Sequence, residues 1–281
     1  MLTEQQLTYF NTFGFITLRG LFSVDEIKIF NEEFQLKLES KLRFTAPQNE
    51  QPKYCSWSNL TVETPVLSKL PKDPRILSIA EQILGEDCFL ISCNAGSYVN
   101  DTRWHPDCRN FHHHSIKFPI YLQPLDGNNG ALRLIPGSHK KPFHDAVSKF
   151  NPPGYDDESM RKGDSIRDVP THACKVEAGD VIIFDAHCWH ASWGGNTDRR
   201  MLSPIYIKTP KTPEEEDAVY ENVKLAHAVR QNLAKNTYAE RQPEYPLEWL
   251  ENAESDPVRQ RWINSLHKWG YIESFQEAQT S

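Results

Sequence analysis

The sequence predicts a mainly β fold with flanking helices, whose core is a closed or two-sheet β structure of the jelly-roll type. Between residues 88 and 208, short runs of apolar and β-branched residues alternate with turns rich in glycine, asparagine and proline, a pattern typical of such folds. Helix-capping sequences and helical spacing of apolar residues mark the flanking segments, 1–87 and 212–281. Because no internal repeat or low-complexity segment divides the 281 residues, we expect a single domain.

The composition narrows the possible functions. Hydrophobic residues make up 38% of the chain, which is typical of a folded globular protein, and the formal net charge of -7 argues against a nucleic-acid or membrane partner. No apolar run reaches the roughly eighteen residues of a transmembrane helix, and the first ten residues lack the features of a secretory signal. The six cysteines form no C-x-x-C pair, so we expect free thiols and a cytoplasmic protein. The sequence carries no signal for the oligomeric state.

The N-terminal segment predicts two helices with a strand between them. Thr3 with Gln6 and Ser23 with Glu26 fit the capping-box pattern, and residues 13–18 are strand-like. The second helix carries one apolar stripe at spacings of three and four, formed by Ile27, Phe30, Phe34 and Leu38. We expect this helix to pack its apolar face on a sheet.

Two segments lack periodicity. Residues 43–73 are rich in proline, and an irregular stretch of this length is often functional, so we expect it to line the substrate entrance. Residues 143–172 are polar and are predicted to lie at the rim of the active site. A short helix is predicted from Pro74 to Leu84, before Gly85. A further helix is predicted from Thr212 to about residue 232, because Thr212, Pro213 and Glu215 form a helix start.

Short apolar runs between turns predict the strands of the core. A turn is predicted at residues 126–130, where aspartate, asparagine and glycine are concentrated. The predicted strands are residues 89–93 and 96–99 (one extended run), 115–123, 131–135, 181–184 and 201–208.

The strongest functional pattern is His105-Pro106-Asp107, followed far downstream by His190. On an extended strand, residues i and i+2 point to the same side, so His105 and Asp107 can reach one ion. Two imidazoles and one carboxylate cover one face of an octahedral Fe(II) ion and leave three positions open. His187 is an alternative third ligand. An H-x-D pair is a weak signal by itself, so the prediction depends on the surrounding motifs.

Those motifs resemble the phytanoyl-CoA dioxygenase family. Residues 129–139 read N-G-A-L-R-L-I-P-G-S-H, which is similar to the family signature N-G-x-L-x-x-x-P-G-S-H. Residues 13–15, and residues 179–185 followed by His190, Asn196 and Arg199-Arg200, resemble its opening and closing motifs. The resemblance covers about residues 5–208 in the right order. It implies a double-stranded β-helix (a jelly-roll, cupin-like core) that binds Fe(II) and 2-oxoglutarate and uses O2.

The resemblance also implies roles for individual residues. It gives His105, Asp107 and His190 as iron ligands. It favours His190 over His187 because the histidine of the family is followed closely by a serine and an asparagine, here Ser192 and Asn196. The triplet His112, His113 and His114 cannot share one strand face, so these residues are expected at the rim, and His139 is expected to be structural.

The distal carboxylate of 2-oxoglutarate requires a fixed cation with paired donors, which arginine supplies. Arg199 and Arg200 are the candidates, and only one can enter the barrel because neighbouring residues on a strand point to opposite faces. Arg199 is the preferred choice. Ser192 is predicted to contact the same carboxylate. Tyr121 and Lys117 are further candidates for contacts with the cosubstrate.

The reaction implied by the resemblance is hydroxylation of an unactivated C–H bond of a small-molecule metabolite, with release of succinate and CO2. Asp107 is present, and some halogenating relatives carry a small residue there, so hydroxylation or desaturation is favoured over halogenation. The acidic net charge argues mildly against a CoA thioester. Alternatives are the same chemistry on a protein side chain, or a ligand-binding barrel without activity. Five aromatic residues are expected either in the pocket wall or in the core: Trp57, Trp104, Phe111, Trp189 and Trp193.

Overall fold

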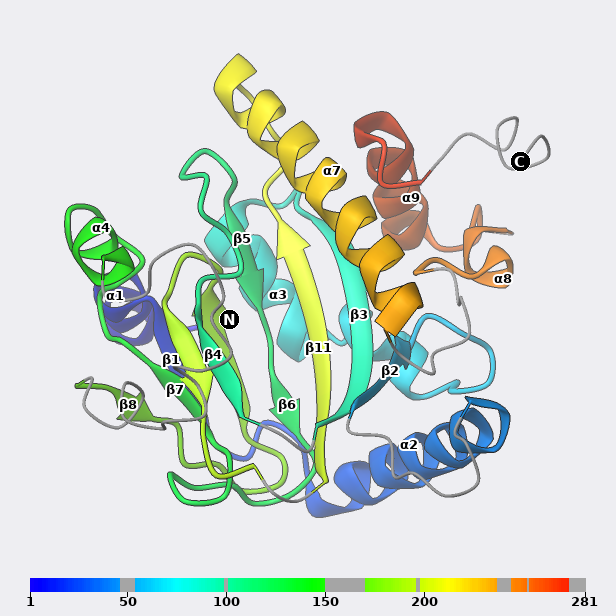
Figure 1. The fold of residues 1–281 in the computed structure, drawn as a ribbon. Coiled ribbons are helices and arrows are strands. Elements are labelled where there is room, and N and C mark those ends of the chain that lie inside the picture. Colours follow the sequence, from blue (N-terminus) through cyan, green and yellow to red (C-terminus); the bar gives the residue numbers. More distant parts are fainter. Residues whose placement is uncertain are drawn as a thin grey trace.

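Two antiparallel β-sheets form the centre of the computed structural model, which describes residues 1–45, 54–98, 101–149, 170–195, 198–236, 244–251 and 253–272 (Figure 1). The larger sheet has the order β1-β9-β5-β11-β3-β2, with β6 pairing with β11 and β9. The smaller sheet has the order β4-β10-β7-β8. The strands of the larger sheet are β1 (Phe15–Leu18), β2 (Tyr54–Ser58), β3 (Phe89–Tyr98), β5 (Ser115–Lys117), β6 (Ile120–Tyr121), β9 (Val181–Asp185) and β11 (Arg199–Ile207). Those of the smaller sheet are β4 (Thr102–His105), β7 (Leu132–Leu134), β8 (His172–Ala173) and β10 (His190–Ser192).

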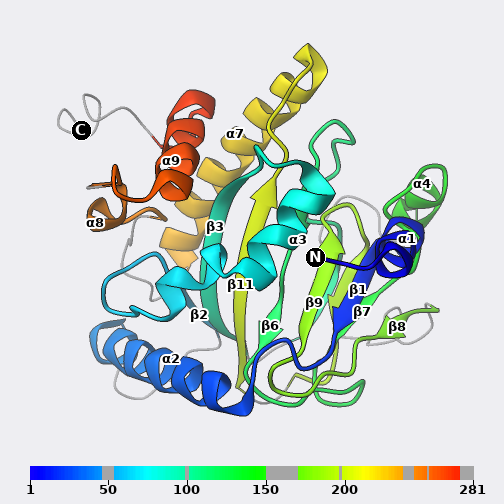
Figure 2. The same cartoon turned by 180° about the vertical axis from the view of Figure 1, so that it is seen from behind.

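Helices cover the outer face of the larger sheet. Figure 2 shows α2 and α3 on this side, with α1 beside β1. The helices are α1 (Glu4–Phe13), α2 (Val24–Thr45), the 3-10 helix η1 (Leu67–Lys72), α3 (Pro74–Leu84), α4 (Phe143–Ser148), α7 (Pro213–Asn236), α8 (Leu247–Leu250) and α9 (Pro257–Trp269). Figure 1 shows α7 crossing in front of β3, with α9 next to it.

Alternating side chains separate two layers of core around the larger sheet. On β9, Val181 and Ile183 belong to the core under the helices. Ile182 and Phe184 point the other way, into a second cluster between the two sheets. On β11, Leu202 and Tyr206 face the helices while Met201 packs against the cluster between the sheets. This period of two fixes which residues can reach the interior of the barrel.

The N-terminal predictions are confirmed with one shift. Both capping boxes form: Thr3 accepts from the Gln6 amide at 3.2 Å, and the Ser23 amide donates to Glu26 at 2.8 Å. The strand expected from Phe13 begins at Phe15, because α1 runs to Phe13 and ends at Gly14 in the left-handed region (φ 82°). A Cβ on Gly14 would come within 2.4 Å of the Cys188 sulfur, so only glycine fits there.

The prediction of an irregular segment at 43–73 is wrong over most of its described part. It contains the end of α2, strand β2 and the 3-10 helix η1, and residues 46–53 lie outside the described residues. Strand β2 forms because it pairs with β3, with Trp57 packing on Phe34 of α2 at a ring distance of 4.8 Å. Strands β1 and β2 both lie before residue 88, so the β core is not confined to residues 88–208 as predicted. These pairings are long-range contacts, which local periodicity does not reveal.

The strand predictions for the core need smaller corrections. The run expected at 115–123 divides into β5 and β6 around Phe118-Pro119, because proline has no amide hydrogen for the ladder. Strand β7 is shorter than the predicted 131–135 by one residue at each end, and β3 ends at Tyr98. Within the predicted excursion at 143–172, the structure shows α4 and the start of β8, whereas residues 150–169 lie outside the described residues.

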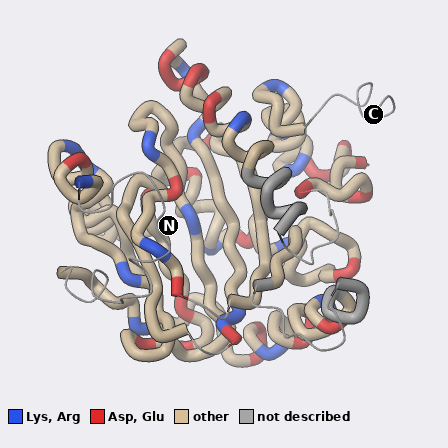
Figure 3. Tube along the Cα trace, in the orientation of Figure 1, with Lys and Arg blue, Asp and Glu red and all other residues tan. Residues whose placement is uncertain are grey.

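The C-terminal helices pack their aromatic residues into the main core. Trp249, Trp262, Trp269 and Tyr271 are all at most 7% exposed, and the ring of Trp262 lies 6.0 Å from that of Tyr206 on β11. The predicted helix after Thr212 continues to Asn236. Acidic residues are concentrated in its first turn, and basic and acidic residues intermingle over the rest of the described chain (Figure 3).

Arg75 ties the starts of α2 and α3 together. Its guanidinium donates to Asp73 at 2.6 Å, to Glu26 at 2.6 Å and to the Leu21 carbonyl at 3.0 Å. It also lies 4.3 Å from the ring centre of Phe22. The hydrogen bond from Arg75 is the main reason why the pKa of Glu26 falls to about 2.

We therefore predict that Arg75→Met destabilises the protein by about 1 kcal/mol at pH 7, a value reduced for the partial exposure of these groups. Because the pKa of Glu26 is lowered on folding, this stabilisation is present above its ordinary value of 4.5 and is lost as the pH falls toward about 2. Urea unfolding of both proteins at pH 7, 4.5 and 3 measures the effect, with the exposed Lys28→Met as the control. A difference that is the same at pH 7 and pH 3 would contradict the role given to Glu26.

Candidate metal centre and cosubstrate pocket

Three side chains converge where β4 and β10 pair. His105 ends β4 and His190 begins β10, and the two residues are direct partners in the antiparallel ladder. One Asp107 oxygen, Oδ1, lies 3.6 Å from the Nε2 atom of each histidine. All three potential ligand atoms lie within 4.8 Å of one another, and no other group of this kind is found among the described residues. Strand β4 ends at His105 and Asp107 lies two residues beyond it, so the expected common strand is wrong although the side chains still converge.

Backbone carbonyls orient both imidazole rings. Nδ1 of His105 lies 2.7 Å from the Arg103 oxygen, and Nδ1 of His190 lies 2.9 Å from the Cys188 oxygen. A carbonyl only accepts hydrogen bonds, so Nδ1 carries the proton in each ring and Nε2 keeps its lone pair toward Asp107. Burial and the neighbouring His105 lower the pKa of His190 to about 3. His190 is therefore neutral near pH 7, as a metal ligand must be.

Lys117 holds the second oxygen of Asp107. Its Nζ atom lies 3.1 Å from Asp107 Oδ2, and 5.9 Å from the ring centre of Phe184. Burial alone would raise the pKa of Asp107, but the positive charge of Lys117 opposes this effect and the pKa lies well below its ordinary value. The carboxylate is thus ionised, with Oδ1 toward the histidines and Oδ2 toward Lys117. Lys117, expected as a cosubstrate contact, lies here against a candidate metal ligand.

The two candidate arginines lie on opposite faces of β11. Arg199 is 3% exposed and donates to the Gly130 carbonyl at 2.9 Å. A Cβ on Gly130 would come within 2.5 Å of Arg199 Cδ, so the glycine of the N-G signature leaves room for this side chain. Arg200 instead donates to Gln35 at 2.5 Å and reaches α2 on the outer face. Of the two, Arg199 is the one directed to the inner face.

Ser192 and Tyr121 share the interior with Arg199. Ser192 lies two residues after His190 on β10, is 2% exposed, and its Oγ has no hydrogen-bond partner among the described residues. Tyr121 pairs with Met201 and belongs to the cluster between the sheets. Burial raises the pKa of Tyr121 to about 12, so its hydroxyl is protonated and can donate. The interior therefore offers an arginine, a serine and a tyrosine to an anionic cosubstrate.

The other histidines are already engaged. His187 contacts Asp185 through Nδ1 at 2.7 Å and the Asn110 carbonyl through Nε2 at 3.0 Å. Although burial lowers its pKa, the hydrogen bond with Asp185 contributes to a net rise to about 10, and a protonated imidazole cannot ligate. His112 and His114 are exposed, but the expectation of a rim position is wrong for His113, which is 2% exposed. His139 contacts the Asn11 carbonyl of α1 at 3.2 Å, a structural contact as expected.

Of the five aromatic candidates, Trp57, Trp104 and Trp189 lie in the core, and Phe111 and Trp193 are partly buried. Trp104 and Trp189 pack on the outer face of the smaller sheet with Val147 of α4, and Trp193 packs against this group. Phe111 stacks on His187 with a ring distance of 4.7 Å. Trp57 packs under α2, as described above. The aromatic ring beside the metal centre is instead Phe184, 4.8 Å from His190. Residues 181–184 are all apolar, so the sequence does not indicate which face of this strand turns toward the interior.

Comparisons with known proteins give the family and the fold. Residues 10–201 match the model of the family described as Phytanoyl-CoA dioxygenase (PhyH). Because this match spans more than half of the chain, the chain belongs to this family. The family resemblance noted above is thus confirmed, and with it the class of enzyme, a non-haem iron, 2-oxoglutarate-dependent dioxygenase. The donor set of two imidazoles and one carboxylate fits the iron that this class uses.

Curated relatives and solved structures agree with this assignment. The chain is 23% identical over 224 residues to an ectoine dioxygenase of Sphingopyxis alaskensis, covering 70% of this chain and 72% of the relative. It is 26% identical to an ectoine dioxygenase of Streptomyces coelicolor, covering 69% and 73%. HygX from Streptomyces hygroscopicus, solved with nickel and 2-oxoglutarate, superposes with a TM-score of 0.59 at 19% identity, covering 74% of this chain and 88% of HygX.

A further solved structure has the same fold. EctD from S. alaskensis, solved with 2-oxoglutarate and 5-hydroxyectoine, superposes with a TM-score of 0.55 at 20% identity, covering 74% of this chain and 76% of EctD. These likenesses confirm the predicted double-stranded β-helix fold. None of the described helices has both the length and the apolar character needed to cross a membrane.

We predict that Lys117→Met weakens Co(II) binding about 10-fold, because the Asp107 carboxylate loses the contact that leaves Oδ1 for the metal. Lys117→Arg should retain most of the affinity, and the exposed Lys140→Met serves as the control. Absorption titration with Co(II) gives the metal affinity, and a second titration at saturating metal gives the affinity for 2-oxoglutarate. Unchanged metal affinity with weakened 2-oxoglutarate binding would instead make Lys117 a direct cosubstrate contact.

We further predict that Arg199→Met raises the KM for 2-oxoglutarate about 100-fold, because a buried carboxylate loses a charge-assisted pair of donors. Arg200→Met should change this KM by no more than about 2-fold, since its side chain contacts α2. Initial rates at varied 2-oxoglutarate compare the two, with circular dichroism as the check on folding. The reverse ranking would exchange the roles of the two arginines.

Proposed function

We propose that this enzyme hydroxylates an unactivated C–H bond of a small-molecule metabolite, with Fe(II) held by His105, Asp107 and His190. The convergence of these three ligand atoms, with Nε2 of both histidines turned toward Asp107, is the observation that carries the proposal. Arg199 binds the distal carboxylate of 2-oxoglutarate, and Ser192 and Tyr121 donate to the cosubstrate. Iron with 2-oxoglutarate and O2 supplies the oxidation of the C–H bond, with release of succinate and CO2.

The side chains divide this work between the two sheets. The smaller sheet holds the metal, since β4 and β10 carry the two histidines. The larger sheet supplies Arg199 from β11 and Tyr121 from β6, which orient the cosubstrate, and Lys117 from β5, which holds the second oxygen of Asp107. Packing of Phe184 against His190 excludes water from one side of the metal centre. Asp107 occupies the third ligand position, which favours hydroxylation over halogenation.

We infer that residues 1–281 form a single catalytic domain in the cytoplasm, without a nucleic-acid or membrane partner. Its core comes mainly from residues 88–208 and is completed by β1 and β2, and residues 212–281 pack over it as a helical tail. The curated relatives act on ectoine by name. Ectoine is therefore a first compound to test, although an identity of 23–26% supports the reaction class and not the substrate.

The test is succinate release by anaerobically iron-loaded protein given 2-oxoglutarate and O2. We expect turnover even without primary substrate, a loss of at least about 100-fold in His105→Ala and Asp107→Ala, and unchanged turnover in the exposed His112→Ala. The Fe(II) protein should also develop a 2-oxoglutarate-dependent absorption band. Neither turnover nor this band in the wild-type protein would contradict the proposal and favour a ligand-binding barrel.

A further inference from the structure

The larger sheet extends beyond the smaller one on the side next to the metal centre. The smaller sheet lies opposite β9 and β5, because His190 contacts Phe184 of β9 and Asp107 contacts Lys117 of β5. The order of the larger sheet then continues through β11 and β3 to β2. Figure 1 shows β11 and β3 beside the smaller sheet and not behind it, with α7 crossing in front of β3. The inner face of these strands therefore adjoins the metal centre, and the element in front of β3 on this side is the helix α7 and not a strand (Figures 1 and 2).

The two faces of this extension differ in exposure. On the outer face, Cys93, Ala95 and Leu202 are at most 1% exposed beneath the helices. On the inner face, Asn94 of β3 and Ile205 of β11 remain partly exposed. The inner face is thus less completely covered than the outer face at Asn94 and Ile205.

An in-register row of polar side chains crosses this inner face. Ser203 of β11 pairs with Asn94 of β3, and Asn94 pairs with Ser58 of β2. Ser58 donates to the Glu244 carbonyl at 2.7 Å, so it is satisfied within the protein. Ser203 is 4% exposed, and its Oγ has no hydrogen-bond partner in the described part of the chain. A buried hydroxyl without a partner costs about 1–3 kcal/mol, and such a group indicates a missing ligand.

The row lies two residues along β11 from the position that pairs with Lys117, the residue that contacts Asp107. Lys117 pairs with Ile205 of β11, and Ser203 is the next residue on the same face of that strand. Arg199, four residues further along, shares this face. The polar row is therefore placed beside the metal centre, between the level of Asp107 and that of the arginine.

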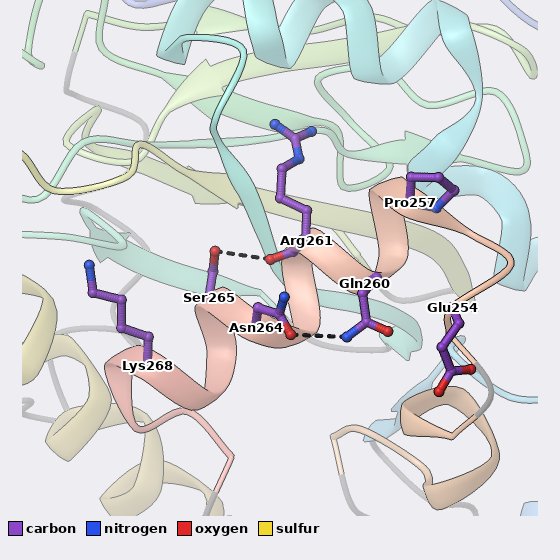
Figure 4. Close-up of a pocket in the computed structure, with 7 residues that line it drawn as sticks. All are labelled: Glu254, Pro257, Gln260, Arg261, Asn264, Ser265 and Lys268. Atoms are coloured by element: carbon purple, nitrogen blue, oxygen red, sulfur yellow. Dashed lines mark hydrogen bonds between the residues drawn. The ribbon is translucent and has the colours of Figure 1, made fainter.

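Elsewhere the described surface offers a groove along α9, lined by Glu254, Arg261 and Lys268 among others (Figure 4). None of its lining residues belongs to either sheet, so this groove cannot present a ligand to the metal centre.

We propose that Ser203 and Asn94 of this row bind the primary substrate, and that this substrate is a hydrophilic molecule with hydroxyl or amide groups and no long alkyl chain. The inference rests on the proposed function, because it assumes that the site oxidises a small molecule. A hydroxyl and an amide both donate and accept, so Ser203 and Asn94 match polar groups of either kind. An alkyl chain packed over Ser203 and Asn94 would leave the polar atoms of both side chains buried without hydrogen-bond partners. This costs more free energy than burying the same atoms with partners.

The test is ligand-observed NMR with Ni(II)- and 2-oxoglutarate-loaded protein and two sets of probes. The hydrophilic set is ectoine, myo-inositol, glucosamine and proline, and the alkyl set is octanoate, decanol and decanoyl-coenzyme A. We expect saturation transfer to at least one hydrophilic probe, reduced at least about 5-fold in Ser203→Ala and Asn94→Leu. Ser97→Ala is the matched control, since Ser97 lies on β3 but faces outward to Asp198.

Other outcomes would overturn the proposal. These are binding of the alkyl set alone, binding of neither set, or hydrophilic binding that both variants leave intact. Weakened 2-oxoglutarate binding in Ser203→Ala would assign Ser203 to the cosubstrate instead. Asn94→Ala, which also removes the amide but adds no bulk, replaces Asn94→Leu if that variant does not fold. Because the NMR signal needs no turnover, failure of the succinate assay and failure of this binding test remain distinguishable.

Discussion

The antiparallel pairing of β4 with β10 is the constraint on which the rest of the site depends. It places His105 directly opposite His190, two residues that lie far apart in the chain. Each ring is then held through Nδ1 by a carbonyl of its own segment, so that both Nε2 atoms turn to the same point. Asp107 needs no strand of its own, because the turn after Pro106 brings its carboxylate to that point. The hydrogen-bonded ladder of β4 and β10 therefore fixes the two imidazoles before any metal binds, which flexible loops could not do.

The larger sheet contributes through the alternation of its side chains. One face of β11 carries Arg199 and Ser203 inward, and the other carries Arg200 and Leu202 toward the helices. The same alternation on β9 places Phe184 against His190. The helices that pack on this sheet bury one face of each strand. The residues of the site must therefore lie on the opposite face. Asp107 links the two sheets through Lys117, so the charge of the metal ligand is balanced from the opposite wall.

The residues of the family-like motifs have separate physical reasons. Gly130 precedes β7 because a side chain there would occupy the space of Arg199. Ser138, in the P-G-S-H segment, is buried and accepts from the Trp189 amide at 2.9 Å, which supports the start of β10 next to His190. Neither residue belongs to the metal centre, but Ser138 supports the strand that carries His190 and Gly130 leaves room for Arg199.

The sequence by itself determined the fold class, the two capping boxes, the three candidate ligands and the pair of candidate arginines. These follow from local patterns: periodicity, turn residues, and an H-x-D pair within recognisable motifs. Only the tertiary structure decided that β2 exists, that Arg200 reaches α2, that His187 pairs with Asp185, and that Lys117 contacts Asp107. Each of these depends on pairing or packing between residues far apart in the chain. The polar row on β11, β3 and β2 belongs to the same group, because a serine and an asparagine on separate strands become neighbours only when the sheet forms.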